Sequence, residues 1–123
     1  MKIIIADDSR VMRSIIEKAI QPLNLETIHA GNGQEVISIL EKNGDEISLI
    51  LLDWNMPVMN GLEVLETIKK RNLHTNIPVL IVSTEAEDNK MTKAFDAGAK
   101  GYLSKPFSPE RLLKLVQGRL ETN

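Results

Sequence analysis

Two short, wholly apolar runs, each followed at once by acidic residues, constrain most strongly what this chain can fold into. Residues 3–6 precede Asp7 and Asp8, and residues 49–52 precede Asp53. Apolar runs of this length, bounded by polar residues, are typical of strands buried on both faces of a parallel sheet. If the two strands are parallel and adjacent, the three carboxylates emerge together at their carboxyl ends, where open α/β sheets bind ligands.

Three carboxylates at one edge of a sheet repel one another. Such a cluster is stable when a cation or a proton neutralises part of the charge, or it is retained because it has a function. The cation that fits is Mg²⁺, because it favours a few carboxylates together with waters and phosphate oxygens. We expect Asp8 and Asp53 to be direct ligands and Asp7 to contribute through water. The backbone carbonyl of Asn55 is the candidate for a fourth protein ligand.

The rest of the chain alternates strand and helix patterns. Apolar runs or alternation predict strands over residues 3–6, 25–29, 49–52, 77–82 and 101–103, the second as an edge strand. Spacing and capping residues predict helices that begin after Ser9, Asn32, Gly61 and Ser108, and a further helix over residues 87–97. Five βα units indicate an α/β fold with three layers, in which five helices flank a parallel five-stranded sheet.

Helical spacing also predicts which residues face the core. At the second helix, Asn32 and Glu35 resemble a capping box in which Glu35 reaches back to the cap. The predicted inward residues are Leu62, Leu65 and Ile68 in the third helix, Met91, Ala94 and Phe95 in the fourth, and Leu112, Leu113, Val116 and Leu120 in the fifth.

Length and composition favour one domain spanning residues 1–123. The formal net charge of -2 and the lack of a basic run longer than residues 69–71 give no reason to expect nucleic acid as a partner. The absence of cysteine excludes disulfides and thiolate-bound metals. No apolar run is long enough to span a membrane and no signal peptide is visible, so we expect a cytoplasmic protein. We also expect a monomer.

Residues after the later strands extend the acidic cluster into a phosphoryl-transfer site. Asp53 is the candidate nucleophile, because a carboxylate can accept a phosphoryl group as an acyl phosphate. The transfer needs charge neutralisation and alignment, and Ser83 and Lys105 are placed at strand ends to contact phosphoryl oxygens. Taken singly, each residue has an ordinary role as a turn residue, a strand-end hydroxyl or a solvated charge. Only the combination indicates phosphoryl transfer.

The combination of Asp7-Asp8, Asp53, Ser83 and Lys105 resembles the receiver domain of two-component response regulators over the entire chain. Asp53-Trp54-Asn55-Met56-Pro57, with Asn60-Gly61-Leu62 behind it, is similar above all to single-domain chemotaxis members of that family. The resemblance implies the strand order 2-1-3-4-5. It also implies phosphorylation of Asp53 by a histidine kinase, with Mg²⁺ held by Asp7, Asp8 and Asn55.

The same resemblance implies a conformational switch. Ser83 and Lys105 match the phosphate-sensing positions, and Tyr102 matches an aromatic residue that turns inward when the hydroxyl is drawn to the phosphate. The surface that changes is formed by the fourth helix, fifth strand and fifth helix. Asn55 and Glu85 match positions that modulate hydrolysis of the acyl phosphate, and Lys105-Pro106 matches a peptide bond that is cis in the family.

We expect output through a partner protein, because the last predicted helix ends near Leu120 and only residues 121–123 follow. The chemotaxis resemblance makes a component of the flagellar motor switch the expected target, with a histidine kinase as phosphodonor and a phosphatase as a further partner. The alternative is a stand-alone receiver in a phosphorelay or another signalling pathway. In both cases the chain is not an enzyme but a phosphoacceptor that catalyses only its own phosphotransfer and dephosphorylation.

Two other classes fit the residues less well. A Mg²⁺-dependent phosphatase of the haloacid dehalogenase type has an aspartyl nucleophile and a second Asp two residues later as acid/base, where this chain has Asn55. Turnover of a small phosphate ester would favour that class. A flavodoxin-like electron carrier needs a hydroxyl- and glycine-rich phosphate loop after the first strand, whereas the acidic residues 7–8 would repel phosphate unless Mg²⁺ intervened.

Overall fold

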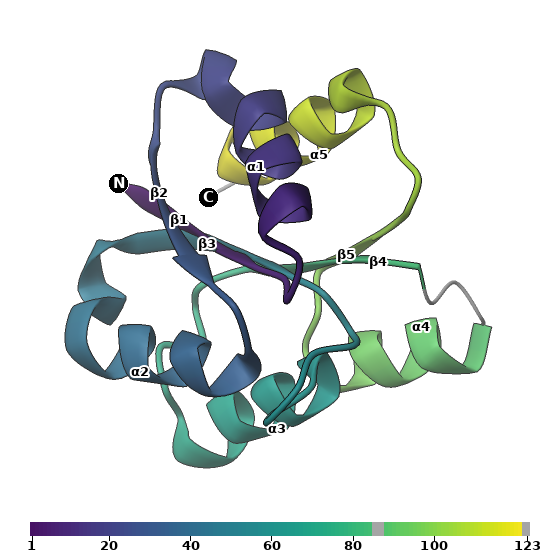
Figure 1. Ribbon diagram of the computed structural model, residues 1–123. Helices are drawn as coiled ribbons and strands as arrows, with labels where there is room; N and C mark the ends of the chain where they lie inside the picture. Colours follow the sequence, from purple (N-terminus) through teal and green to yellow (C-terminus); the bar gives the residue numbers. More distant parts are fainter. Residues whose placement is uncertain (85–87, 122–123) are drawn as a thin grey trace.

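The computed structural model describes residues 1–84 and 88–121, which form a parallel sheet with helices on both faces (Figure 1). The strands are β1 (Lys2–Ala6), β2 (Glu26–Ala30), β3 (Ile47–Leu52), β4 (Val79–Ser83) and β5 (Gly101–Ser104). The helices are α1 (Arg10–Ile20), α2 (Gly33–Asn43), α3 (Gly61–Arg71), α4 (Asp88–Asp96) and α5 (Pro109–Glu121). Short 3-10 turns, η1 (Gln21–Leu23) and η2 (Gly44–Glu46), follow α1 and α2. All ten predicted strands and helices are present.

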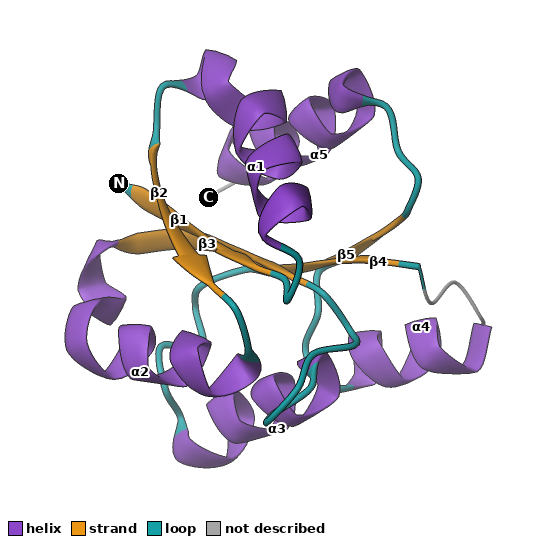
Figure 2. Ribbon diagram, in the orientation of Figure 1, coloured by secondary structure: helices purple, strands orange, loops and turns teal. Residues whose placement is uncertain are grey.

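All neighbouring strands run parallel in the order β2-β1-β3-β4-β5, which confirms the predicted fold class and strand order. Helices α1 and α5 cover one face of the sheet, and α2, α3 and α4 cover the other (Figure 2). This order places β1 beside β3, and therefore places the residues that follow these two strands beside one another. Among the described residues, no helix combines the length and the apolar character needed to cross a membrane.

Alternate residues of the central strands pack on opposite faces of the sheet. In β1, Ile3 and Ile5 belong to the core cluster on the α1 and α5 side. Ile4 and Ala6 belong to the cluster on the α2, α3 and α4 side. All four are at most 2% exposed, so a polar side chain at any of these positions would lose its water without gaining a partner. Burial on both faces is why the run contains no polar residue.

Side-chain caps fix where the first three helices begin. Ser9 caps α1 as predicted, and α3 begins with a complete capping box formed by residues 60 and 63. At α2 the Asn32 side chain accepts from the N–H of Glu35 at 2.9 Å. The Glu35 carboxylate, however, accepts from the N–H of Gly31 at 2.7 Å, one residue farther back than in a capping box. Each acceptor satisfies an N–H group that has no partner inside a helix.

Two predicted inward positions are wrong. Phe95 of α4 is 45% exposed, because Ala94 takes the fully buried position of this short helix. In α5, Leu113 is only half-buried, and Leu115 packs against the core cluster. Residues at the margins of the apolar stripe of an amphipathic helix are only partly covered, so spacing alone does not decide which of them packs on the core.

Candidate phosphoacceptor and metal site

The three acidic side chains lie together at the carboxyl ends of β1 and β3. The register pairs Ala6 with Leu52, so Asp7 and Asp53 follow neighbouring strands at the same level. The N–H of Asp53 donates to the carbonyl of Ala6 at 2.9 Å, which continues the sheet hydrogen bonds to the candidate nucleophile. One carboxylate oxygen from each of Asp7, Asp8 and Asp53 lies within 4.8 Å of the others. The predicted cluster is therefore formed by all three residues.

Lys105 enters this cluster from the loop after β5. Its Nζ lies 2.6 Å from Asp7 Oδ2 and 3.5 Å from Asp53 Oδ2. Asp7 and Asp53 are 1% and 7% exposed, whereas Asp8 is exposed. The N–H of Lys105 donates to the Ser83 carbonyl at 2.9 Å, and the bond to Pro106 is cis, as the resemblance implied. One ammonium therefore bridges two buried carboxylates.

The surroundings of Asp53 favour its neutral form. Burial raises the pKa of Asp53 above its ordinary value of 3.8, and the charge of Asp7 raises that pKa further. The Lys105 ammonium acts in the opposite direction, as do hydrogen bonds from the Ser83 hydroxyl and from the N–H of Trp54. The pKa is nevertheless raised, chiefly because burial disfavours the charged form, so the Lys105 ammonium does not offset the combined effects of burial and Asp7.

The donor set suits Mg²⁺. Three carboxylates offer hard oxygen ligands, and the exposure of Asp8 leaves access for the waters that Mg²⁺ retains. The Asp7 carboxylate is already oriented by the N–H of Ser9, which donates to its Oδ1 at 2.8 Å. Asp7, Asp8 and Asp53 would hold the ion, which would supply the positive charge that Lys105 supplies only in part.

The other predicted residues lie at different places around the carboxylates. Ser83 is fully buried at the end of β4, and its hydroxyl bonds to Asp53. Tyr102 on β5 is half-buried and packs against the core on the α2, α3 and α4 side. Asn55 is exposed. Glu85 lies outside the described residues. The structure thus brings both Ser83 and Lys105 to Asp53. The functional roles of Ser83, Tyr102, Asn55 and Glu85 stay predictions.

The loop after Asp53 has two features that sequence reasoning missed. A Cβ on Gly61 would lie 2.6 Å from the Asp53 carbonyl oxygen, so only glycine allows α3 to begin this close to the nucleophile. Val58 has φ 70°, in the left-handed region that disfavours β-branched residues, and it is 78% exposed. The Asn60-Gly61 pair is a recognisable turn signal, but nothing in the sequence indicates a left-handed valine.

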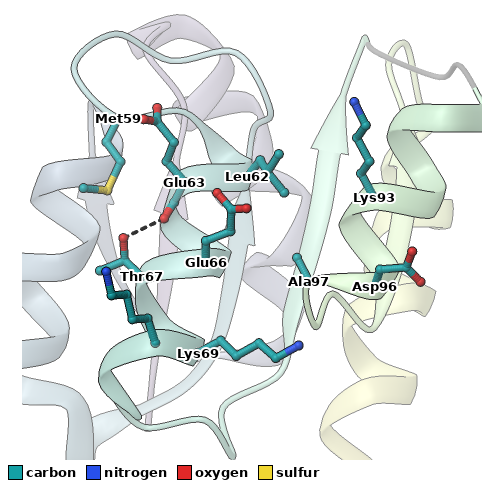
Figure 3. A pocket seen from close by; sticks show the side chains of 10 residues that line it. Met59, Leu62, Glu63, Glu66, Thr67, Lys69, Lys93, Asp96 and Ala97 are labelled. Carbon is teal, nitrogen blue, oxygen red and sulfur yellow. Dashed lines mark hydrogen bonds between the residues drawn. The ribbon is translucent and has the colours of Figure 1, made fainter.

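A groove of about 930 Å³ lies between α3 and α4, apart from the carboxylates (Figure 3). Its lining combines half-buried apolar residues with charges of both signs on both helices. It consists of Met59, Leu62, Glu63, Glu66, Thr67, Lys69, Lys70, Lys93, Asp96 and Ala97. The groove lining does not include the acidic cluster, Ser83 or Lys105. The candidate chemistry therefore belongs to the edge of the sheet and not to this groove.

The raised pKa of Asp53 predicts how stability depends on pH. A carboxyl whose pKa rises on folding contributes stability below its ordinary value of 3.8, and that contribution is lost as the pH rises through the raised pKa. Without divalent ions, Asp53→Asn should therefore unfold at a higher urea concentration than the wild type at neutral pH. The difference should shrink as the pH falls through the raised pKa and should be smallest below 3.8. Asp45→Asn, at a side chain 99% exposed, is the control, and an equal gain there would contradict this explanation.

Taken together, the sheet order and the edge site define an α/β protein whose acidic cluster, hydroxyl and lysine converge beyond the carboxyl ends of the strands. Residues 3–117 match the response regulator receiver domain, and the chain belongs to this family. Receiver domains of this type act as signalling switches.

Its relatives include chemotaxis proteins. The chain is 34% identical to a chemotaxis protein CheY homolog of Campylobacter jejuni, an alignment that covers 99% of this chain and 94% of the relative. It is 35% identical to chemotaxis protein CheY1 of Helicobacter pylori strain J99, covering 100% and 99% of the two chains. Among solved structures, chemotaxis response regulator CheY4 of Vibrio cholerae superposes with a TM-score of 0.86 at 32% identity, covering 96% and 97% of the chains. The protein is therefore a CheY-like receiver domain.

Proposed function

We propose that this protein is a stand-alone response regulator that a histidine kinase phosphorylates on Asp53 in a Mg²⁺-dependent reaction. The observation that carries the proposal is the convergence of three groups on Asp53: the Lys105 ammonium, the Ser83 hydroxyl and the carboxylates of the acidic cluster. A carboxylate that only capped a turn would not need a half-buried lysine and a buried hydroxyl beside it. The proposal treats residues 1–123 as one receiver domain.

The proposed reaction is transfer of a phosphoryl group to a carboxylate oxygen. An oxygen of ionised Asp53 attacks phosphorus, the P–N bond of the kinase phosphohistidine breaks, and the departing imidazole takes a proton from solvent. Mg²⁺, when bound by Asp7, Asp8, Asp53 and the Asn55 carbonyl, would neutralise charge on the phosphoryl oxygens. Ser83 and Lys105 would each contact one of those oxygens. Asn55 and Glu85 would modulate hydrolysis, and the decay rate of the phosphorylated Asn55→Ala protein tests the first of these roles.

The proposed output is a change of surface. Before phosphorylation Lys105 bonds to Asp7 and Asp53, so contact with a phosphoryl oxygen would require its ammonium to shift. Movement of Ser83 toward the phosphoryl group would open space into which the half-buried Tyr102 could turn. The phosphoryl group would bias two states through its different contacts in each. A change from mostly off to mostly on needs about 5 kcal/mol, which several charge-assisted hydrogen bonds can supply.

We propose a component of the flagellar motor switch as the target, with the surface of α4, β5 and α5 as the binding face and a phosphatase as a further partner. The support is the chemotaxis naming of relatives that match almost the entire chain. The protein would act in the cytoplasm as a monomer, with no nucleic acid partner. The second candidate is a receiver in a phosphorelay or another pathway. A phosphatase with an aspartyl nucleophile is less favoured, because Asn55 stands where its acid/base would be.

Affinity capture from the source cell tests the proposed output. The bait is the protein with Mg²⁺ and beryllofluoride, which mimics the aspartyl phosphate, and the control bait is Asp53→Ala under the same conditions. Selective retention of a flagellar switch component is the expected result. Selective retention of a phosphotransfer protein would move the switch to a phosphorelay, and equal retention by both baits would contradict activation through Asp53.

A further inference from the structure

Arg13 of α1 connects the acidic loop to the end of the edge strand. Its Nη1 donates to the backbone carbonyl of Asp7, and its Nε donates to Nδ1 of His29 on β2 at 3.4 Å. A Cβ on Gly31, just beyond β2, would lie 3.6 Å from the same Nη1. The guanidinium therefore lies between the loop after β1 and the chain that leaves β2.

The far side of His29 is held as well. Its Nε2 lies 2.9 Å from Oε1 of Glu17, and the Thr27 hydroxyl donates to the other oxygen of Glu17 at 2.9 Å. The hydrogen bond from Thr27 lowers the pKa of Glu17, so this carboxylate is an ionised acceptor at neutral pH. His29 then donates through Nε2 and offers Nδ1 to Arg13 as the acceptor. The arginine is thus supported by α1 and β2 together.

The Asp7 carbonyl lies in the peptide that leads to Asp8, and the other polar groups of Asp7 have partners of their own. The N–H of Asp7 bonds to the Ala30 carbonyl at 3.0 Å, and its carboxylate bonds to Ser9 and Lys105. Its carbonyl belongs to the peptide that joins Asp7 to Asp8, and Arg13 is the donor to it. The Asp8 side chain is exposed, so packing does not hold it, and the direction of this peptide sets where its Cβ starts.

We propose that Arg13 is a positioning residue of the metal site, which aims the Asp8 carboxylate by holding the Asp7 carbonyl against the end of β2. This inference rests on the proposed function, since it assumes that Asp7, Asp8 and Asp53 bind Mg²⁺. The direction of the expected change in Mg²⁺ affinity distinguishes this role from a simple effect of charge. A guanidinium near a cation site repels the cation, so removing its charge alone would strengthen Mg²⁺ binding, whereas losing its hold on the loop would weaken it.

Mg²⁺ titration of Arg13→Gln separates these effects. Trp54 is the sole tryptophan and follows Asp53 directly, so its fluorescence is the readout. Partners that orient metal ligands typically change affinity about tenfold or more, and we expect Arg13→Gln to bind Mg²⁺ about tenfold more weakly. Arg13→Lys, which keeps the charge and a donor, should recover part of the loss. Arg10→Gln removes the same charge from an exposed position of the same helix, and its affinity should be unchanged or higher.

Each outcome bears on a different claim. Unchanged or tighter Mg²⁺ binding by Arg13→Gln would overturn the positioning role, even if urea unfolding showed the variant to be less stable. If Arg13→Gln does not fold, Arg13→Lys decides, and affinity equal to the wild type would overturn the proposal. Failure of the wild type itself to bind Mg²⁺ would instead overturn the proposed metal site.

Discussion

Asp53→Asn should abolish phosphorylation by acetyl phosphate in the presence of Mg²⁺. The amide has the shape of the carboxylate but lacks the anionic oxygen that attacks phosphorus, and loss of a nucleophile lowers rates by more than about a thousandfold. Ser83 and Lys105 remain in the variant, but neither supplies a carboxylate in place of the lost one. Intact-protein mass spectrometry, with the wild type under the same conditions, is the measurement.

Two controls make this result specific to the site. Asp45→Asn, at an exposed position of η2 before β3, should accept phosphate as the wild type does. Chelation of Mg²⁺ should reduce labelling of the wild type as strongly as the Asp53 substitution does. Full labelling of Asp53→Asn would show that a different residue is the acceptor.

Lys105→Gln should destabilise the protein in the absence of divalent ions and strengthen its binding of Mg²⁺. Removing an ammonium that lies 2.6 Å from Asp7 and 3.5 Å from Asp53 leaves two neighbouring buried carboxylates uncompensated. Breaking such a pair costs about 2 kcal/mol at an edge that solvent can reach, less than in a closed interior. The vacated oxygens then become available to Mg²⁺, so the ion should restore more stability to the variant than to the wild type.

Urea unfolding with and without Mg²⁺ measures both effects. Lys100→Gln is the matched control, because Lys100 is an exposed lysine at the opposite end of β5, and its stability should respond to Mg²⁺ as the wild type does. Equal stability and equal Mg²⁺ response in Lys105→Gln would show that the ammonium contributes nothing to the carboxylates before phosphorylation.

The meeting of Asp7, Asp8 and Asp53 was predictable because it depends on two strong local signals. Each apolar run is buried on both faces, and each is followed directly by acidic residues. The carboxylates therefore lie where the two strands end, at one edge of the sheet. The order of the strands was not predictable from these local signals. Pairing β1 with β3 joins segments far apart in sequence, and it came from the resemblance rather than from periodicity.

Contacts made by long side chains were not predictable from the pattern. The sequence predicts that Lys105 contacts a phosphoryl oxygen, and nothing local indicates that its ammonium first bonds to Asp7. The helical pattern after Ser9 includes Arg13, but it does not indicate that the Arg13 guanidinium reaches the Asp7 carbonyl. Such contacts depend on rotamers and on elements that meet only in the folded chain, and sequence spacing contains neither.

The bond between Lys105 and Asp7 joins residues separated by 98 positions, from the loops after the last and the first strand. A chain whose β5 has not yet docked therefore lacks the Lys105 ammonium beside Asp7 and Asp53. If Asp53 accepts a phosphoryl group as proposed, transfer to it would require the first and last βα units to be docked, and partly folded molecules would react poorly.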